Sequence, residues 1–278
     1  MKLSCITFTF PLLAMEQAAA IFKILGFEYI DIIGYTKAPF DAITPWDIQR
    51  DPKAMQTKFE AVTTRHGFKP NDYFFTFGEG FTDRPVNTPN LDLRAENRDV
   101  FRHVVAFCRK NGLRHITMLP GVIWDDLGPD RSLELASDAL RELVDIAGEA
   151  GLPVGIEPHL QSVSESIPRT QQLLAMTKGL TLTLDYTHFI AQDIRQNEID
   201  VLAPHASHFH ARQGAPGRLQ AGMDDGTIDY PAVARTLKRA GYDGFLTLEY
   251  SYQSWQGCDK TENVSETIRL MEQLVAAM

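Results

Sequence analysis

Four residues that could bind a metal ion stand at the ends of four short apolar runs in the second half of the chain. Runs of this length, rich in Val, Ile, Leu, Phe and Thr, are typical of buried strands. If the strands are parallel, their carboxyl ends meet at one edge of the sheet. The run before each residue is 153–156 for Glu157, 180–184 for Asp185, 206–209 for His210 and 245–248 for Glu249.

Three carboxylates brought together need a counter-charge, because an ionised carboxylate withdrawn from water is costly unless it is paired. A divalent cation supplies that charge. Three oxygen donors and one imidazole suit Mn²⁺, Mg²⁺ or Co²⁺ and leave positions for substrate oxygens. Zn²⁺ is a weaker choice, since no thiolate or histidine cluster accompanies the set. We therefore expect one divalent ion, with Mn²⁺ as the first choice and Mg²⁺, Co²⁺ or Zn²⁺ as alternatives.

The expected chemistry is proton transfer beside a carbonyl group. A bound cation polarises a carbonyl or an adjacent hydroxyl and so acidifies the neighbouring C–H bond. Carboxylates on opposite faces of the substrate can then remove and return a proton. Return to the same carbon is an epimerisation, delivery to the next carbon is an isomerisation, and loss of a β-hydroxyl is a dehydration. The four residues alone do not choose among these reactions.

The elements that must position these residues alternate along the whole chain. Amphipathic stretches such as 93–111, 132–150 and 230–240 separate the apolar runs, and their apolar residues recur at helical spacing. Glycines stand where a helix should end and the chain should turn into the next strand. The expected strands are 2–8, 28–33, 70–76, 114–119, 153–157, 180–185, 206–211 and 244–249.

Eight strand–helix units predict a parallel sheet closed into a (β/α)8 TIM barrel, an α/β fold. The stretch 78–90 contains Gly, Asp, Pro and Asn and reads as a long loop in the third unit. An open doubly wound sheet is the alternative, but no GxGxxG motif supports it. With no Pro/Ser-rich linker and no charge block, we expect one domain over residues 1–278.

The composition of the chain indicates which partners and which cellular compartment to expect. The 278 residues carry a formal charge of -9, which disfavours binding to nucleic acid. No segment is long and apolar enough for a membrane span, and we interpret residues 2–8 as a first strand rather than part of a secretory signal. The three cysteines (Cys5, Cys108, Cys258) are far apart, which indicates a reducing compartment. We expect a cytoplasmic enzyme with neither nucleic acid nor membrane as partner.

Several polar residues near the four strand ends are candidates for substrate binding. The segment 211–220 contains Arg212, Arg218 and Gln220, and arginine suits a phosphate, a carboxylate or a pair of polyol oxygens. His159, in the loop after Glu157, could contact a substrate hydroxyl. Other candidates are Phe10 and Pro11 as pocket lining, Trp124 as a ring stacked on a sugar face, and Asp31 as a group behind the ligands.

The motifs in the C-terminal half resemble those of the sugar phosphate isomerase/epimerase family of xylose isomerase-like barrels. This family includes ketose 3-epimerases, hydroxypyruvate isomerases and inosose dehydratases. The resemblance covers nearly the whole chain in element order and is most specific from about residue 150 to 250. The sequences that carry it are Gly155-Ile156-Glu157-Pro158-His159, Leu184-Asp185-Tyr186-Thr187-His188, His208-Phe209-His210 and Leu246-Thr247-Leu248-Glu249-Tyr250.

The resemblance implies roles for single residues. Glu157, Asp185, His210 and Glu249 would be the metal ligands, and Glu157 and Glu249 would also carry protons. His188 would contact substrate, as would an arginine after the seventh strand, for which Arg218 is the counterpart. Many members have an apolar residue, Lys and Asp after the metal histidine; here Ala211-Arg212-Gln213 stands instead. Family analogy also implies a dimer or a tetramer.

Four functions compete at this point. A metal-dependent sugar isomerase or epimerase comes first, and a lyase that dehydrates or β-eliminates an oxidised sugar or inosose comes second. A nuclease of the endonuclease IV type should carry more histidines at strand ends and a basic rim. A barrel that only binds sugar has no need for two ionised glutamates beside a metal.

Overall fold

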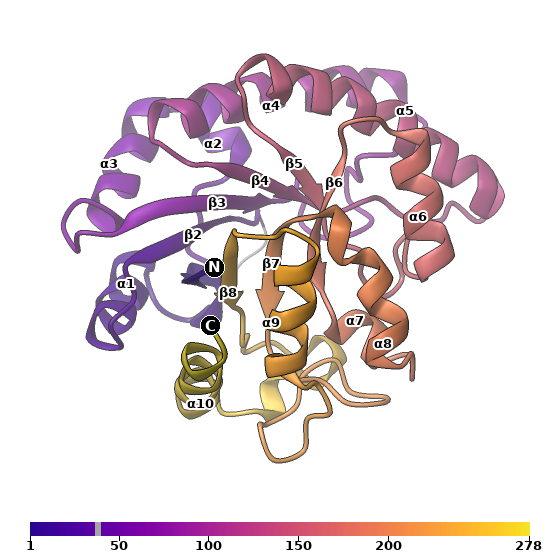
Figure 1. Cartoon of the computed structure of the whole chain (residues 1–278). Helices are drawn as coiled ribbons and strands as arrows, with labels where there is room; N and C mark the ends of the chain where they lie inside the picture. Colours follow the sequence, from indigo (N-terminus) through magenta and orange to yellow (C-terminus); the bar gives the residue numbers. More distant parts are fainter. Residues whose placement is uncertain (37–39) are drawn as a thin grey trace.

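The computed structural model describes residues 1–36 and 40–278, and its eight strands form one closed parallel barrel (Figure 1). Each strand pairs with its neighbour in chain order, and β1 pairs with β8 to close the ring. The expected (β/α)8 barrel is therefore confirmed. Its strands are β1 (Lys2–Ile6), β2 (Tyr29–Gly34), β3 (Lys69–Phe75), β4 (His115–Met118), β5 (Val154–Ile156), β6 (Thr181–Asp185), β7 (Ala206–Ala211) and β8 (Phe245–Leu248).

Helices surround the barrel, and the expected stretches 93–111, 132–150 and 230–240 correspond to α4, α5 and α9 (Figure 1). The α-helices are α1 (Met15–Ile24), α2 (Pro45–Arg50), α3 (Pro52–Val62), α4 (Leu91–Lys110), α5 (Gly128–Glu149), α6 (Ile167–Met176), α7 (Thr187–Ile190), α8 (Gln196–Ile199), α9 (Tyr230–Arg239) and α10 (Asn263–Ala277). Three 3-10 helices complete the fold: η1 (Thr7–Thr9), η2 (Asp200–His205) and η3 (Trp255–Lys260).

Local sequence signals set the ends of several helices. The Asn90 side chain accepts hydrogen bonds from the backbone N–H groups of Asp92 and Leu93 and so begins α4. Six glycines before strands adopt φ between +66° and +91°, a conformation that only glycine takes without strain. These turns lead into β2, β3, β4, β5, β6 and β8. The six are Gly26, Gly67, Gly112, Gly151, Gly179 and Gly241.

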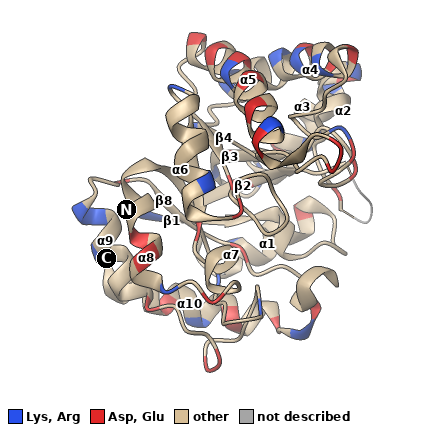
Figure 2. Ribbon diagram, turned by 90° about the vertical axis from the view of Figure 1, so that its right-hand side faces the viewer, with Lys and Arg blue, Asp and Glu red and all other residues tan. Residues whose placement is uncertain are grey.

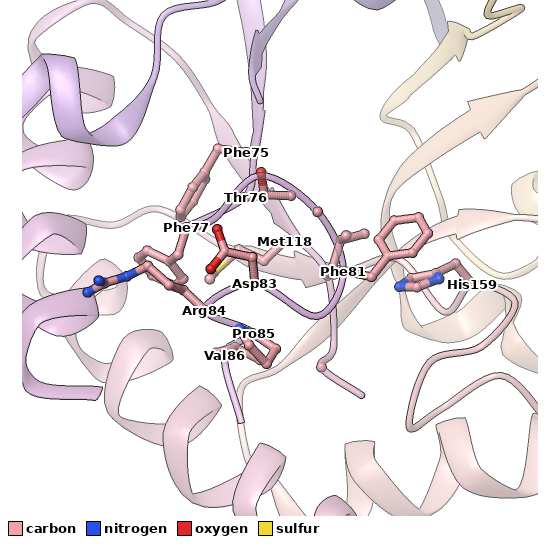
Figure 3. Close-up of a pocket in the computed structure, with 13 residues that line it drawn as sticks. Phe75, Thr76, Phe77, Phe81, Asp83, Arg84, Pro85, Val86, Met118 and His159 are labelled. Carbon is pink, nitrogen blue, oxygen red and sulfur yellow. The ribbon is translucent and has the colours of Figure 1, made fainter. Parts of the chain in front are cut away.

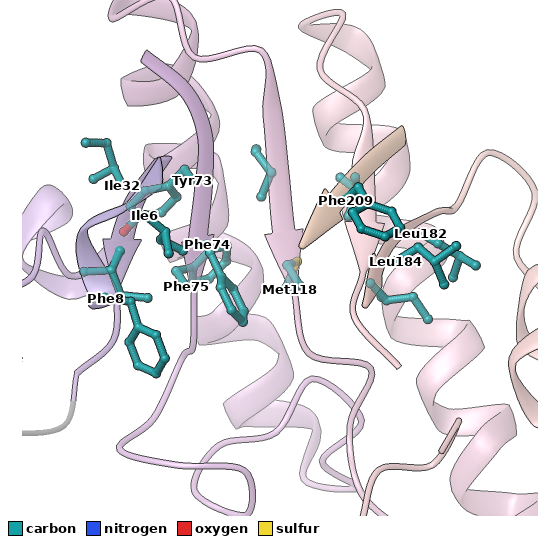
Figure 4. Packing of buried hydrophobic residues seen from close by; sticks show 14 of the residues in the cluster. Ile6, Phe8, Ile32, Tyr73, Phe74, Phe75, Met118, Leu182, Leu184 and Phe209 are labelled. Carbon is teal, nitrogen blue, oxygen red and sulfur yellow. The ribbon is translucent and has the colours of Figure 1, made fainter. Parts of the chain in front are cut away.

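Apolar side chains from the strands form a continuous core (Figure 4). A parallel sheet covered by helices is buried on both faces, which explains why its strands are nearly uniformly apolar. The core reaches from β1 to β7 through Ile6, Ile32, Tyr73, Phe74, Phe75, Met118, Leu182, Leu184 and Phe209. Against this background, buried polar residues on the strands stand out and need an explanation.

The outer surface carries charges of both signs, as on α4 and α5 in Figure 2. Among the described residues, no helix combines the length and the apolar character that crossing a membrane requires. Cys5, Cys108 and Cys258 are all buried and unpaired. The stretch 78–90 lies between β3 and α4 and contains no helix or strand, as expected from its composition.

Candidate active site

The four residues expected at the strand ends lie at the carboxyl ends of β5 to β8. Glu157 and Glu249 come directly after β5 and β8, Asp185 ends β6, and His210 is the penultimate residue of β7. All four are almost completely buried, with exposed fractions of 4% or less. The barrel topology therefore brings together residues that are far apart in the sequence.

Three of the four converge on one point. His210 Nδ1 lies 2.6 Å from Glu157 Oε1 and 3.3 Å from Glu249 Oε2. One donor atom from each residue lies within 4.8 Å of the other two. Asp185 stands beside this group rather than within it, because its carboxylate groups with Glu157 and His188. Glu157 belongs to both groups and links them.

Asp185 is held by hydrogen bonds that its neighbours donate. Its Oδ1 accepts from the backbone N–H and the hydroxyl of Thr187, at 2.8 and 2.7 Å, and its Oδ2 accepts from Arg212 Nη2 at 2.9 Å. Burial alone would raise the pKa of Asp185, but Arg212, His188 and the Thr187 hydrogen bonds outweigh it and lower the pKa. The Asp185 carboxylate is therefore ionised, and the Arg212 guanidinium compensates its charge.

Glu157 and Glu249 have the opposite character. Burial, followed by repulsion from Asp185, raises the pKa of Glu157 to about 8. Burial raises the pKa of Glu249 to about 7, although His210 and Arg212 oppose the shift. Both carboxyl groups are thus deprotonated only at a cost that a nearby cation would remove.

The donor set fits a divalent cation. Glu249 Oε2 is buried and has no hydrogen-bond partner in the described part of the chain. Two carboxylates and one imidazole nitrogen around one point are a typical ligand set for such an ion. Glu157, His210 and Glu249 would hold the ion, with Asp185 beside them, and its charge would compensate the two glutamates.

A second buried polar cluster lies further along the barrel, centred on Asp31 of β2. Its Oδ1 accepts hydrogen bonds from Ser4 and Asn71, and its Oδ2 from His208 and Thr247, at 2.6 to 2.9 Å. These contacts, with the charge of His208, overcome burial and lower the pKa of Asp31 to about 2. Asp31 does lie behind the His210 cluster, and its carboxylate has all its partners within the protein.

One pocket is lined by both Glu157 and Glu249. Four aromatic side chains form part of its wall, and His159, His188, Arg212 and Gln253 contribute polar groups besides the two glutamates. The residues around it are Phe8, Tyr35, Phe81, Leu119, Glu157, His159, His188, Arg212, Glu249, Gln253 and Trp255. Wide apolar surfaces with a few fixed polar groups are typical of small-molecule sites.

A neighbouring pocket shares part of this wall (Figure 3). Residues of the loop 76–86 line it, and the Phe81 ring packs against the His159 ring at a tilt, with ring centroids 4.5 Å apart. On its far side Arg84 forms an ion pair with Glu96 and packs over the Trp46 ring. This second pocket contains neither Glu157 nor Glu249, so we assign the chemistry to the first.

Two of the expected substrate-binding histidines line the site. Leu160 N donates to His188 Nδ1 at 3.3 Å, and His188 Nε2 lies 3.4 Å from Arg212 Nη2, 3.7 Å from Asp185 Oδ2 and 4.0 Å from Glu157 Oε2. Burial lowers the pKa of His188 well below its usual value and that of His159 to about 4. Both rings are therefore neutral, and the His188 ring lies beside the carboxylates.

Arg218 and Gln220 lie outside this pocket. Arg218 is half exposed, pairs with Asp225 at 3.2 Å and lines a separate polar pocket. Gln220 is buried and donates to the backbone oxygens of Ser251 and Cys258, so it ties the loop after β8 to the loop after β7. Their contact with substrate stays a prediction.

The sequence predicted only some of the aromatic residues that line the pocket with Glu157 and Glu249. Phe8 lines the pocket, whereas Phe10 and Pro11 line a different one, because η1 turns the chain after β1. Trp124 is not among the lining residues and donates to the Asn87 backbone oxygen. Phe81 and Trp255 come from two distant loops and meet with ring centroids 5.0 Å apart. No pattern in the sequence places these two rings together.

Comparison with known families agrees with this arrangement. The family model for the xylose isomerase-like TIM barrel matches residues 20–274. The chain belongs to this family. The expected family is thus confirmed, including for the N-terminal half, where the motifs were least specific.

Individual relatives are distant. The L-ribulose-5-phosphate 3-epimerase UlaE of Salmonella paratyphi A is 23% identical over 171 residues, which cover 59% of this chain and 60% of that protein. D-psicose 3-epimerase from Clostridium cellulolyticum H10 has a TM-score of 0.72 at 14% identity, covering 100% of this chain and 96% of the other. The probable 3-DHS dehydratase AsbF from Bacillus anthracis has a TM-score of 0.70 at 13% identity, covering 99% of both chains. At these identities the solved structures establish the fold alone.

Proposed function

We propose that this protein is a divalent-metal-dependent isomerase or epimerase of a small sugar or keto-sugar. The observation that carries the proposal is the pair of buried carboxyl groups, Glu157 and Glu249, that face the same His210 nitrogen at 2.6 and 3.3 Å. Both line one pocket, and the pKa values of both are raised to about 8 and about 7. Groups with pKa values near the working pH are the most effective proton carriers.

The proposed reaction uses the two glutamates in turn. A divalent cation, when bound, polarises a substrate carbonyl and acidifies the adjacent C–H bond. Glu157 or Glu249 takes the proton from one face of that carbon, and the other glutamate supplies a proton from its own side. His188 contacts a substrate oxygen, and the rings of Phe8, Phe81 and Trp255 exclude water from the reacting carbon.

The names of the relatives support this class of substrate, since UlaE is an L-ribulose-5-phosphate 3-epimerase and D-psicose 3-epimerase also acts on a sugar. A second candidate is a lyase that dehydrates or β-eliminates an oxidised sugar or inosose. We retain the lyase as a candidate because the chain shares its fold with the probable dehydratase AsbF. The two candidates differ in the product, which keeps its mass in the first and loses water or another leaving group in the second.

The test is incubation of the Mn²⁺-loaded protein with a panel of keto-sugars in D₂O, followed by NMR and mass spectrometry. We expect deuterium at one carbon beside the carbonyl in a product of otherwise unchanged mass. Loss of water from a substrate would instead favour the lyase. If no sugar in the panel exchanges hydrogen although Mn²⁺ is bound, the proposed function is wrong.

A further inference from the structure

Arg212 occupies a place in the pocket that the proposed proton transfer does not use. Its guanidinium is 3% exposed and lines the pocket together with Glu157 and Glu249. Nη2 donates to Asp185 Oδ2 at 2.9 Å, and Nε donates to Thr187 Oγ1 at 3.3 Å. The Tyr230 hydroxyl donates to the backbone oxygen of Arg212. These contacts fix the position of the guanidinium.

One nitrogen of this guanidinium is left for a ligand. In the described parts of the chain Nη1 donates to no acceptor, and it is not among the buried atoms that lack a partner. Nη1 therefore reaches the pocket that Arg212 lines. A guanidinium has five N–H donors and remains charged at any relevant pH, so an anionic oxygen is the partner it favours most.

The charges of the site agree with an anionic ligand. Three ionised carboxylates and one divalent ion would leave a net negative charge, which would repel an anion. Arg212 cancels that charge. Among the described residues around the pocket it is the one Lys or Arg, so the site offers a single cationic side chain. A phosphate is usually held by several donors, whereas one arginine suits a carboxylate.

The position of Arg212 also limits where the anionic group sits on the substrate. Nη2 lies 3.8 Å from Glu249 Oε2. Because Glu249 exchanges a proton with the reacting carbon in the proposed function, a group bound at Nη1 must be attached close to that carbon. We propose that Arg212 binds a substrate carboxylate next to the reacting keto group, so that the substrate is a keto-sugar acid rather than a neutral ketose. This inference rests on the proposed function, because the proton transfer by Glu249 is what locates the reacting carbon.

The test compares pairs of sugars that differ only at this group. 2-Keto-D-gluconate and D-fructose share one carbon skeleton and differ in a carboxylate against a CH₂OH group. Titration calorimetry on the Mn²⁺-loaded protein should give a Kd for the acid that is lower by about tenfold or more, the usual worth of a hydrogen bond between charged groups. Further pairs of 2-keto acids and ketoses cover other stereochemistries, and inorganic phosphate is the third probe.

Variants separate Arg212 from the cation, which also attracts carboxylates. In Arg212→Gln the preference for the acid should fall to about twofold or less, with a larger change in the Kd for the acid than in the Kd for the neutral ketose. Arg212→Lys should keep part of the preference. Mn²⁺ binding, measured separately, should persist in both variants. Arg212→Gln removes a positive charge that repels the cation, and Arg212→Lys leaves the charge of the site unchanged. Arg195→Gln, at an exposed arginine paired with Glu198, is the matched control and should leave all values unchanged.

Three results would overturn the inference: no sugar pair in which the acid binds more tightly, a preference for the acid that survives in Arg212→Gln, or tighter binding of inorganic phosphate than of any sugar acid. The first and third need only the wild-type protein, so the inference can fail even if a variant does not fold. These measurements compare affinities and do not use hydrogen exchange as the readout. If no sugar exchanges hydrogen in D₂O, the proposed function is contradicted, but the role of Arg212 in binding is still decided by the affinities.

Discussion

Asp31 and Glu249 are both buried carboxylates inside one barrel, but only the first is surrounded by donors. Asp31 accepts hydrogen bonds from four side chains, and its pKa is lowered to about 2. Glu249 keeps a buried oxygen without a partner, and its pKa is raised to about 7. A protein leaves a carboxyl group in the second state at a cost, which a bound cation and substrate would offset. This contrast is what we expect between a structural cluster and the proposed reactive one.

The largest expected effect follows from removing a proton carrier. Glu249→Gln should lower the rate of hydrogen exchange by about a thousandfold or more, since general acid–base catalysis contributes roughly 10²- to 10⁴-fold and the cation is weakened as well. Exchange into substrate in D₂O measures the loss, and circular dichroism should show an unchanged fold. Glu134→Gln, at an exposed glutamate paired with Arg131, is the control. Exchange at the wild-type rate in Glu249→Gln would remove this residue from the mechanism.

The second prediction concerns stability, for which Asp31 should matter more than Glu249. Asp31→Asn leaves His208 without its carboxylate partner, and breaking a buried pair in this way costs about 3 to 5 kcal/mol. Denaturant unfolding of the metal-free protein should report that loss. Glu249→Gln should lose less stability in the same experiment, because Glu249 Oε2 accepts no hydrogen bond from the described residues. Equal destabilisation by the two substitutions would contradict the distinction between the clusters.

The third prediction concerns pH. The pKa values of Glu157 and Glu249 rise from an ordinary 4.5 to about 8 and about 7, so folding favours their protonated forms. The metal-free protein should therefore lose stability as the pH increases from about 4.5 to 8. Mn²⁺ needs the deprotonated forms, so its affinity should increase over pH 6 to 8. Chemical unfolding and calorimetry at several pH values measure both trends, and flat profiles would show that these groups do not titrate as proposed.

The smallest expected effect tests whether the two clusters communicate through His210. Its Nε2 and Asp72 Oδ2 are both buried without a partner, and the two residues belong to one group of closely spaced donors with Asp31 and His208. A carboxylate behind a metal-binding histidine typically accounts for about 10- to 100-fold in metal affinity. Asp72→Asn should weaken Mn²⁺ binding by about tenfold. An unchanged Mn²⁺ affinity would mean that the lower cluster serves the fold alone.

Much of the fold followed from the sequence because it depends on local signals. Short apolar runs and glycines before them predicted the eight strands, and the rule that parallel strands end at one edge predicted the meeting of Glu157, His210 and Glu249. Asp185 was expected among them, yet its contacts to Thr187 and Arg212 depend on side-chain directions that no spacing encodes. The meeting of Phe81 and Trp255 depends likewise on the course of two long loops.

Calorimetric titration of Mn²⁺ into the metal-free wild-type protein and into Glu249→Gln tests the central claim most directly. We expect one Mn²⁺ per chain in the wild type, with uptake accompanied by proton release near pH 7, and an affinity that falls at least tenfold in the variant. Absence of Mn²⁺ binding to the wild type, or binding that is equally tight in Glu249→Gln, would contradict the assignment of this cluster as a metal-dependent reactive site.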